Sequence, residues 1–172
     1  MSDHQEIEKI NEEIRKRFQI VEKDLFHCNT VTELCENLLK KIGEVFNIPF
    51  VWMTLIDEPS TEYLKKELTL STYLVERLNL MKRDAFTEIV GPTIVPVLVN
   101  RDITPFFRLL PDNTKYFIKS FAICPLTFDH NIVMGSINCG DPSSSRYHSD
   151  MDTTLLDSLM RKVSTRLCYF IA

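Results

Sequence analysis

Two apolar runs separated by a short polar break constrain the fold of this chain more than any other feature. The first run spans residues 118–128 and the second spans residues 131–139, and both are rich in β-branched, aromatic and small apolar residues. Asp129 and His130 lie between them, and both residue types are common in tight turns. The pattern predicts a β-hairpin, and therefore an antiparallel sheet.

Amphipathic helices are predicted at both ends of the chain. Residues 3–27 repeat apolar side chains at steps of three and four, at Ile7, Ile10, Ile14, Phe18, Val21 and Leu25. This stripe is narrow, which indicates a partner helix in the same chain or in a second copy. A second helix begins after Asn29 or Thr30, because Thr30 and Glu33 have capping-box spacing. The last helix is predicted to begin near Ser149, which suits an N-cap.

The middle of the chain adds strands and shorter helices. Residues 48–57 predict a buried strand. Residues 92–99 predict an edge strand or an extended segment, because Pro96 has no N–H to donate to a ladder. A helix is predicted from about Thr72 through the sequence TYLVERLNLMKR. A short helix is predicted with Asp102 as its cap, and it would run through Phe107 and Arg108. Helices at both ends and an antiparallel hairpin together predict an α+β fold, with a sheet covered by helices on both faces.

The composition excludes several classes of function. The length of 172 residues suits one domain, and the net charge of −4 lacks the basic footprint of a nucleic-acid binder. The five cysteines form no CxxC pair and the four histidines form no HxxxH or HExxH array, so no metal or cofactor is expected. The N-terminus is polar, and the most apolar stretch, residues 89–99, is broken by two prolines. We therefore expect a cytoplasmic protein that binds neither nucleic acid nor membrane.

The hairpin also carries a family resemblance. Ser120 opens its first strand, the pair Pro125-Leu126 follows, and Gly135 lies within the second strand. These residues, with the polar turn between the strands, resemble the C-terminal core of GAF domains. The sequence that follows resembles the uncharacterised bacterial domain-of-unknown-function family 484, at Asp141, Pro142, Tyr147, Met151, Asp152, Thr153, Leu155 and Leu156. The matching motifs lie within residues 119–160.

One face of the predicted sheet has the character of a ligand pocket. Side chains alternate along strands, and the hairpin register is predicted with Phe128 opposite Asn131. The resulting face is apolar with a few polar points, as ligand pockets are, and consists of Trp52, Thr54, Phe121, Ser136 and Asn138. Arg101 belongs to the segment expected to cover this face, where an arginine can pair with an anionic ligand. The alternatives are a collapsed core whose hydroxyls bond to neighbouring backbone and, for Arg101, a solvated helix cap and surface charge.

Two further features allow a chemical or a structural interpretation. Residues 143–146, Ser-Ser-Ser-Arg, offer hydroxyls and a guanidinium to a phosphate, but the loop has no glycine after Gly140, which favours a connector.

Cys124 and Cys139 lie on neighbouring strands, and some GAF relatives use cysteines to reduce a sulfoxide. In the predicted register the two thiols are several residues apart, which favours two small buried side chains.

The resemblance implies a sensory or regulatory module without catalytic residues. A small molecule would bind the sheet face, and the helix in residues 1–28 would pair two copies of a GAF-like domain that spans residues 29–172. The residues expected at this homodimer interface are Ile7, Ile10, Ile14, Phe18 and Val21. An interaction protein without a ligand and a cysteine-dependent reductase of the GAF type are the alternatives. The ligand and the separate output protein are not identified by the sequence.

Overall fold

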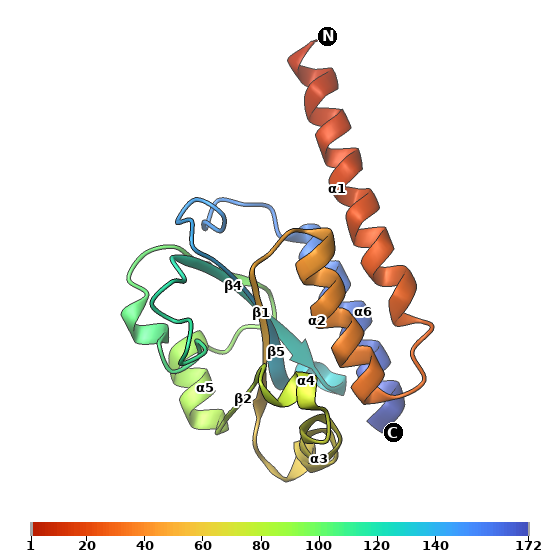
Figure 1. Cartoon of the computed structure of the whole chain (residues 1–172), viewed down its shortest axis with the longest axis vertical. Coiled ribbons are helices and arrows are strands. Elements are labelled where there is room, and N and C mark those ends of the chain that lie inside the picture. Colours follow the sequence, from red (N-terminus) through yellow and green to blue (C-terminus); the bar gives the residue numbers. More distant parts are fainter. Residues whose placement is uncertain (1, 172) are drawn as a thin grey trace.

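Five strands form one mixed sheet in the computed structural model, which describes residues 2–171 (Figure 1). The strands are β1 (Phe50–Ile56), β2 (Leu78–Met81), β3 (Val97–Val99), β4 (Ser120–Thr127) and β5 (Val133–Asp141). Their order is β2-β1-β5-β4-β3, which makes β3 an edge strand, as predicted. All neighbouring pairs are antiparallel except β1 and β2, which run parallel and depart from the expected antiparallel sheet.

Helices cover both faces of this sheet, as the sequence predicted. The α-helices are α1 (Asp3–Leu25), α2 (Val31–Val45), α3 (Glu62–Thr69), α4 (Thr72–Val75), α5 (Arg83–Val90) and α6 (Thr154–Ile171). Single 3₁₀ turns lie at η1 (Pro59–Thr61), η2 (Thr104–Phe106) and η3 (Asp129–Asn131). Figure 1 shows α1, α2 and α6 on one side of the sheet and α5 on the other. Within residues 2–171, no helix is long and apolar enough to cross a membrane.

The sheet separates two apolar layers. On the side of α1, α2 and α6, buried strand residues include Ala122, Cys124 and Ile137. On the other side, Phe121 and Ile123 pack with α5 and with the segment that follows β3. Successive side chains of β4 therefore enter opposite layers, as the two-residue period of a strand requires.

The start of α2 is built by the residues that the sequence indicated. The Thr30 hydroxyl accepts the N–H of Glu33 at 3.1 Å. The Glu33 carboxylate accepts the N–H of Asn29 at 3.0 Å, one residue before the N-cap itself. Two backbone donors that lack helical partners are thus satisfied, and the chain is held as it turns from α1 into α2.

The predicted helix from Thr72 is wrong beyond its first turn. α4 ends at Val75, and Leu78–Met81 pair with β1 as strand β2. These residues have no strong intrinsic preference for helix or strand, so the free edge of β1 determines that they form a strand. The parallel β1–β2 pair needs a crossover connection, which α3 and α4 supply.

Two predicted helix caps are also wrong. Asp102 has a left-handed φ of 52°, and η2 begins after it with no side-chain cap at Ile103. α6 begins at Thr154 rather than near Ser149, and its first N–H is accepted by Asp152 Oδ1 at 2.9 Å. In both places the residue type suits a cap, but the backbone turns before the helix begins.

The register of the hairpin differs from the prediction by two residues. Cys124 lies opposite Ile137 rather than Gly135, because the turn is longer than predicted and includes a left-handed His130 and Asn131. A shift of two residues keeps each side chain on its predicted face. Strict alternation from Ser136 predicts Met134 on the face of Phe121 and Val133 on the opposite face. The irregularity at Leu126/Thr127 reverses these two, so Met134 packs with Cys124 and Val133 packs with Phe121.

Candidate functional site

Three polar side chains form a hydrogen-bonded chain on the sheet face that the sequence analysis singled out. Thr54 of β1 lies opposite Ser136 of β5, two residues from Asn138. Ser136 Oγ donates to Asn138 Oδ1 at 2.8 Å, and Asn138 Nδ2 donates to Thr54 Oγ1 at 3.0 Å. All three residues are fully buried, where a polar group without a partner is costly. We call these residues the polar trio.

Two aromatic residues complete this face and hold the segment above it. Trp52 Nε1 donates to the carbonyl of Leu109 at 2.9 Å. Phe121 meets Phe106 edge to face, with 5.3 Å between ring centroids. Trp52 and Phe121 are at most 2% exposed. The segment of residues 101–118, which we call the cover, therefore packs directly on the face.

Five of the six predicted ligand-binding residues thus lie together, and Arg101 does not lie with them. Arg101 is exposed in the loop after β3, and it makes no side-chain hydrogen bond or ion pair to the described residues. The other five share one face of β1, β4 and β5, where Trp52 and Phe121 contact the cover. Their face is closed, as in the collapsed-core alternative, but the three polar side chains bond to one another rather than to neighbouring backbone.

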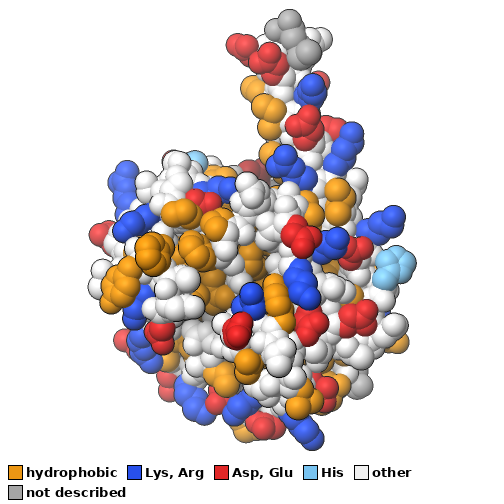
Figure 2. All heavy atoms as spheres, in the orientation of Figure 1, with side chains coloured by type: hydrophobic (Ala, Val, Ile, Leu, Met, Phe, Trp, Pro, Cys, Tyr) orange, Lys and Arg blue, Asp and Glu red, His pale blue; other side chains and the backbone are white. Residues whose placement is uncertain are grey.

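The predicted interface residues divide into a free part and a buried part along α1. Ile7 and Ile10 are 57% and 55% exposed, and Figure 2 shows hydrophobic side chains on the part of α1 that projects from the body. Ile14 is partly buried. Phe18 packs on Phe46, with ring centroids 4.7 Å apart, and Val21 is buried in the core of the same chain. One apolar stripe therefore serves the chain's own core at one end and is uncovered at the other.

The cysteines of the hairpin are closer together than predicted, but they are sealed. Cys139 lies opposite Ala122, so Cys124 and Cys139 are diagonal neighbours on one face. Such neighbours have Cα atoms about 7–8 Å apart, beyond the usual span of a disulfide. Burial raises the pKa of the Cys139 thiol to about 12 and also raises the pKa of the Cys124 thiol. Because the thiolate is the reactive form, this environment does not favour the reductase hypothesis.

The serine loop after β5 is tied to the body by its own polar groups. Asp141 Oδ1 accepts the N–H of Ser143 at 2.8 Å, and Ser120 Oγ donates to the Ser143 carbonyl at 2.6 Å. Arg146 donates to the carbonyl of Phe46 at 2.6 Å and pairs with Asp141 at 3.6 Å. The Arg146 guanidinium is thus already paired, and the hydroxyls of Ser143 and Ser145 bond to each other at 2.8 Å, which favours a connector. No group of three or more metal-ligating side chains is present among residues 2–171.

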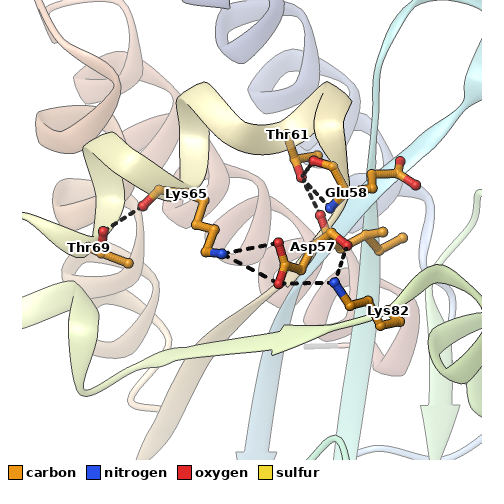
Figure 3. Close-up of polar contacts among 7 residues, drawn as sticks. Asp57, Glu58, Thr61, Lys65, Thr69 and Lys82 are labelled. Atoms are coloured by element: carbon orange, nitrogen blue, oxygen red, sulfur yellow. Dashed lines mark hydrogen bonds and ion pairs between the residues drawn. The ribbon is translucent and has the colours of Figure 1, made fainter.

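Charged residues hold together the elements that meet where β1 ends (Figure 3). The Asp57 carboxylate lies 3.3 Å from Lys65 Nζ of α3 and 3.5 Å from Lys82 Nζ. Glu58 pairs with Arg83, which also donates to the carbonyl of Val133 at 2.8 Å. These hydrogen bonds lower the pKa of both carboxyl groups. We call this cluster the β1 clamp, since it links α3, α5 and β5 to the end of β1.

A cleft that the sequence analysis did not identify lies at the open edge of β1. Its volume is about 1160 Å³, and Pro49–Trp52 line one side of it. The walls come from α2, from α4 and the start of β2, and from residues 108–114 of the cover. The polar residues of these walls include Lys40, Glu44, Glu76, Arg77, Asn79, Arg108, Asp112 and Thr114. The cleft depends on where β2 begins. The sequence analysis predicted a helix where β2 forms, and it therefore could not predict the cleft.

Comparison with known proteins identifies the fold. No family model and no curated protein matches the chain. Among solved structures, it is similar to the GAF domain from Acinetobacter phosphoenolpyruvate-protein phosphotransferase, with a TM-score of 0.62 over 98% of this chain and 95% of that chain. The chain has a GAF-like fold. The two sequences are 13% identical, so the likeness concerns the fold and assigns no residue a role. The finer resemblance to family 484 stays a prediction.

Proposed function

We propose that this chain is a regulatory module of GAF-like fold that works as a homodimer paired through α1. The observation that carries the proposal is the free part of that helix: residues 3–13 project from the body with every side chain exposed (Figure 1). A helix of about three turns is marginal in water when nothing packs against it. A second copy of the same helix supplies the missing partner.

The exposed side chains support this partner choice. Ile7 and Ile10 continue the stripe whose other end, at Phe18 and Val21, packs on the chain's own core. Burying one such side chain fully stabilises an assembly by about 1.5–3 kcal/mol. In a symmetric pair both copies contribute the same residues, so the gain is doubled.

A charge placed in the stripe tests the pairing. Ile10→Glu is expected to convert a dimer to a monomer in sedimentation velocity, because the carboxylate would be buried without a partner. Gln19→Glu adds the same charge on the opposite side of α1, where the side chain is exposed, and should remain dimeric. A wild-type monomer at all concentrations, or an unchanged dimer in Ile10→Glu, would rule out pairing through this helix.

The second part of the proposal is that the module binds a small molecule. The ligand would lie beneath the cover, against Trp52, Phe121 and the polar trio, with Arg101 near the entrance. Because these five residues are buried, entry requires the cover to move. That movement supplies the two states of different ligand affinity that a sensor needs. The cover is built from loops and one 3₁₀ turn, which are easier to displace than a packed helix.

An interaction module without a ligand is the second candidate, and the closed polar trio favours it. Native mass spectrometry of freshly purified protein, with release and identification of bound compounds, separates the two. A stoichiometric small molecule that protects the Trp52 fluorescence from quenching supports the sensor. A protein free of ligand, with unchanged quenching after incubation with a metabolite extract, supports the interaction module.

A further inference from the structure

We propose that the cleft at the open edge of β1 binds an extended peptide segment, which adds to the sheet as a short strand beside Val51. This site is separate from the sheet face beneath the cover, and it requires neither the dimer nor the small molecule of the proposed function.

The backbone of Val51 is the first support for this site. The N–H of Met53 donates to the carbonyl of Arg77 at 2.8 Å, so odd-numbered residues of β1 direct their backbone groups toward β2. Val51, two residues earlier, directs its N–H and C=O to the same side. The segment before β2 does not continue alongside Val51, because the N–H of Arg77 donates to the carbonyl of Leu74 instead of to β1. Within residues 2–171 neither backbone group of Val51 has a partner on this side, which is the usual template for strand addition.

The space beside this edge suits a peptide. The cleft of about 1160 Å³ exceeds the range of roughly 300–1000 Å³ that is typical for compact small ligands. It extends from α2 across Pro49–Trp52 to residues 108–114. An extended chain that lies along the edge would place alternate side chains toward these two walls.

The walls offer charges of both signs. Lys40, Arg77 and Arg108 are the cations, and Glu44 and Glu76 are among the anions. Among the described residues, Arg108 and Glu44 have no ion-pair or side-chain hydrogen-bond partner. A polyanion such as a nucleotide favours a cationic site, whereas a peptide carries donors, acceptors and charges of both signs. The mixed lining therefore favours a peptide.

One wall is already ordered for binding. The Arg77 guanidinium lies over the Tyr73 ring at 3.8 Å and donates to the Tyr73 carbonyl at 2.9 Å. Lys40 lies over the same ring at 4.6 Å. Ordered side chains reduce the entropy lost on binding.

The experiment selects peptides and then removes a single donor from the protein. Random dodecapeptides displayed on phage are selected on the immobilised full chain, and the affinities of enriched sequences are measured with synthetic peptides. Val51→Pro removes the cleft-facing N–H and no donor of the ladder to β5, since that ladder uses the even-numbered residues of β1. Val51→Ala is the matched control, because it shortens the side chain and keeps the N–H.

Enriched peptides should bind Val51→Pro about tenfold more weakly than Val51→Ala, the loss expected for one backbone hydrogen bond. Binding should survive Ile10→Glu, so failure of this proposal and failure of α1 pairing are distinguishable. If no peptide is enriched, or if enriched peptides bind both Val51 variants equally, the proposal is overturned.

A measurement on the peptide side applies if Val51→Pro does not fold, which a thermal melt shows. Each amide of the tightest peptide is N-methylated in turn, and exchange of the Val51 amide proton is followed by NMR on the wild-type chain. One methylated position should abolish binding, and bound peptide should slow the exchange of Val51. Unchanged exchange with bound peptide overturns strand addition at this edge.

Discussion

Gly135 of β5 lies opposite Leu55 and close to the backbone of β1. A Cβ atom at this position would lie 2.2 Å from the carbonyl oxygen of Thr54 and 3.1 Å from the Cα of Leu55. Both atoms belong to a central strand that is hydrogen-bonded on each side, so neither can move far. The glycine that contributes to the family resemblance is thus required by the packing of two backbones.

Gly135→Ala should lower the free energy of unfolding by about 3 kcal/mol, measured by urea denaturation, because overpacking displaces the strand. Gly43→Ala in α2 is the matched control. The nearest atoms to a Cβ there lie at 3.5 and 3.6 Å, an ordinary contact distance. In a helix, alanine should stabilise by about 0.5–1 kcal/mol relative to glycine. Equal effects at the two sites would contradict this account of Gly135.

The polar trio makes a second residue-scale prediction. Thr54→Val keeps the side-chain shape but removes the acceptor of Asn138 Nδ2, which should cost about 1–3 kcal/mol of stability. In Asn138→Ala that donor is already absent, so the further change Thr54→Val should cost clearly less. A double-mutant cycle by urea denaturation measures the difference. Additive effects would show that the bond between the two residues is energetically unimportant.

At the scale of elements, the β1 clamp makes stability depend on pH. Hydrogen bonds from Lys65 to Asp57 and from Arg83 to Glu58 lower the pKa of both carboxyl groups in the folded chain. A lowered folded pKa means that the carboxylate stabilises the fold above its ordinary pKa and that this contribution is lost on acidification. Stability should therefore fall as the pH drops below about 4.5, the ordinary pKa of Glu58.

Urea denaturation at a series of pH values tests this expectation. Glu58→Gln should be less stable at neutral pH and should show a shallower loss toward acid, because the titrating group is gone. Glu12→Gln, in an exposed ion pair with Arg15, is the control and should leave the slope unchanged. A wild-type slope retained in Glu58→Gln would assign the acid sensitivity to other groups.

At the scale of the whole molecule, α1 has two roles along one stripe. Its second half packs on α2 and α6, whereas the side chains of residues 3–13 are all exposed. A chain that lacks residues 2–13 should therefore fold, sediment as a monomer and lose any concentration dependence of its thermal midpoint. Sedimentation and thermal melts over a wide concentration range measure both. A truncated chain that remains dimeric would place the interface elsewhere.

The sequence by itself determined the features that depend on local periodicity. The α1 stripe, the cap at Thr30 and the faces of the hairpin all follow from neighbouring side chains. The faces were predicted correctly away from the turn, although the register was wrong, because a shift of two residues preserves a period of two. This is why five of the six predicted pocket residues lie together.

Only the tertiary structure decided the features that depend on contacts between segments far apart in the sequence. Leu78–Met81 form a strand because β1 offers an edge there, and four residues carry too little intrinsic preference to resist it. The cover is held by bonds such as that from Trp52 to Leu109, which no local pattern encodes. The cleft beside Val51 exists because β2 begins late. Its position follows from packing between segments far apart in the chain.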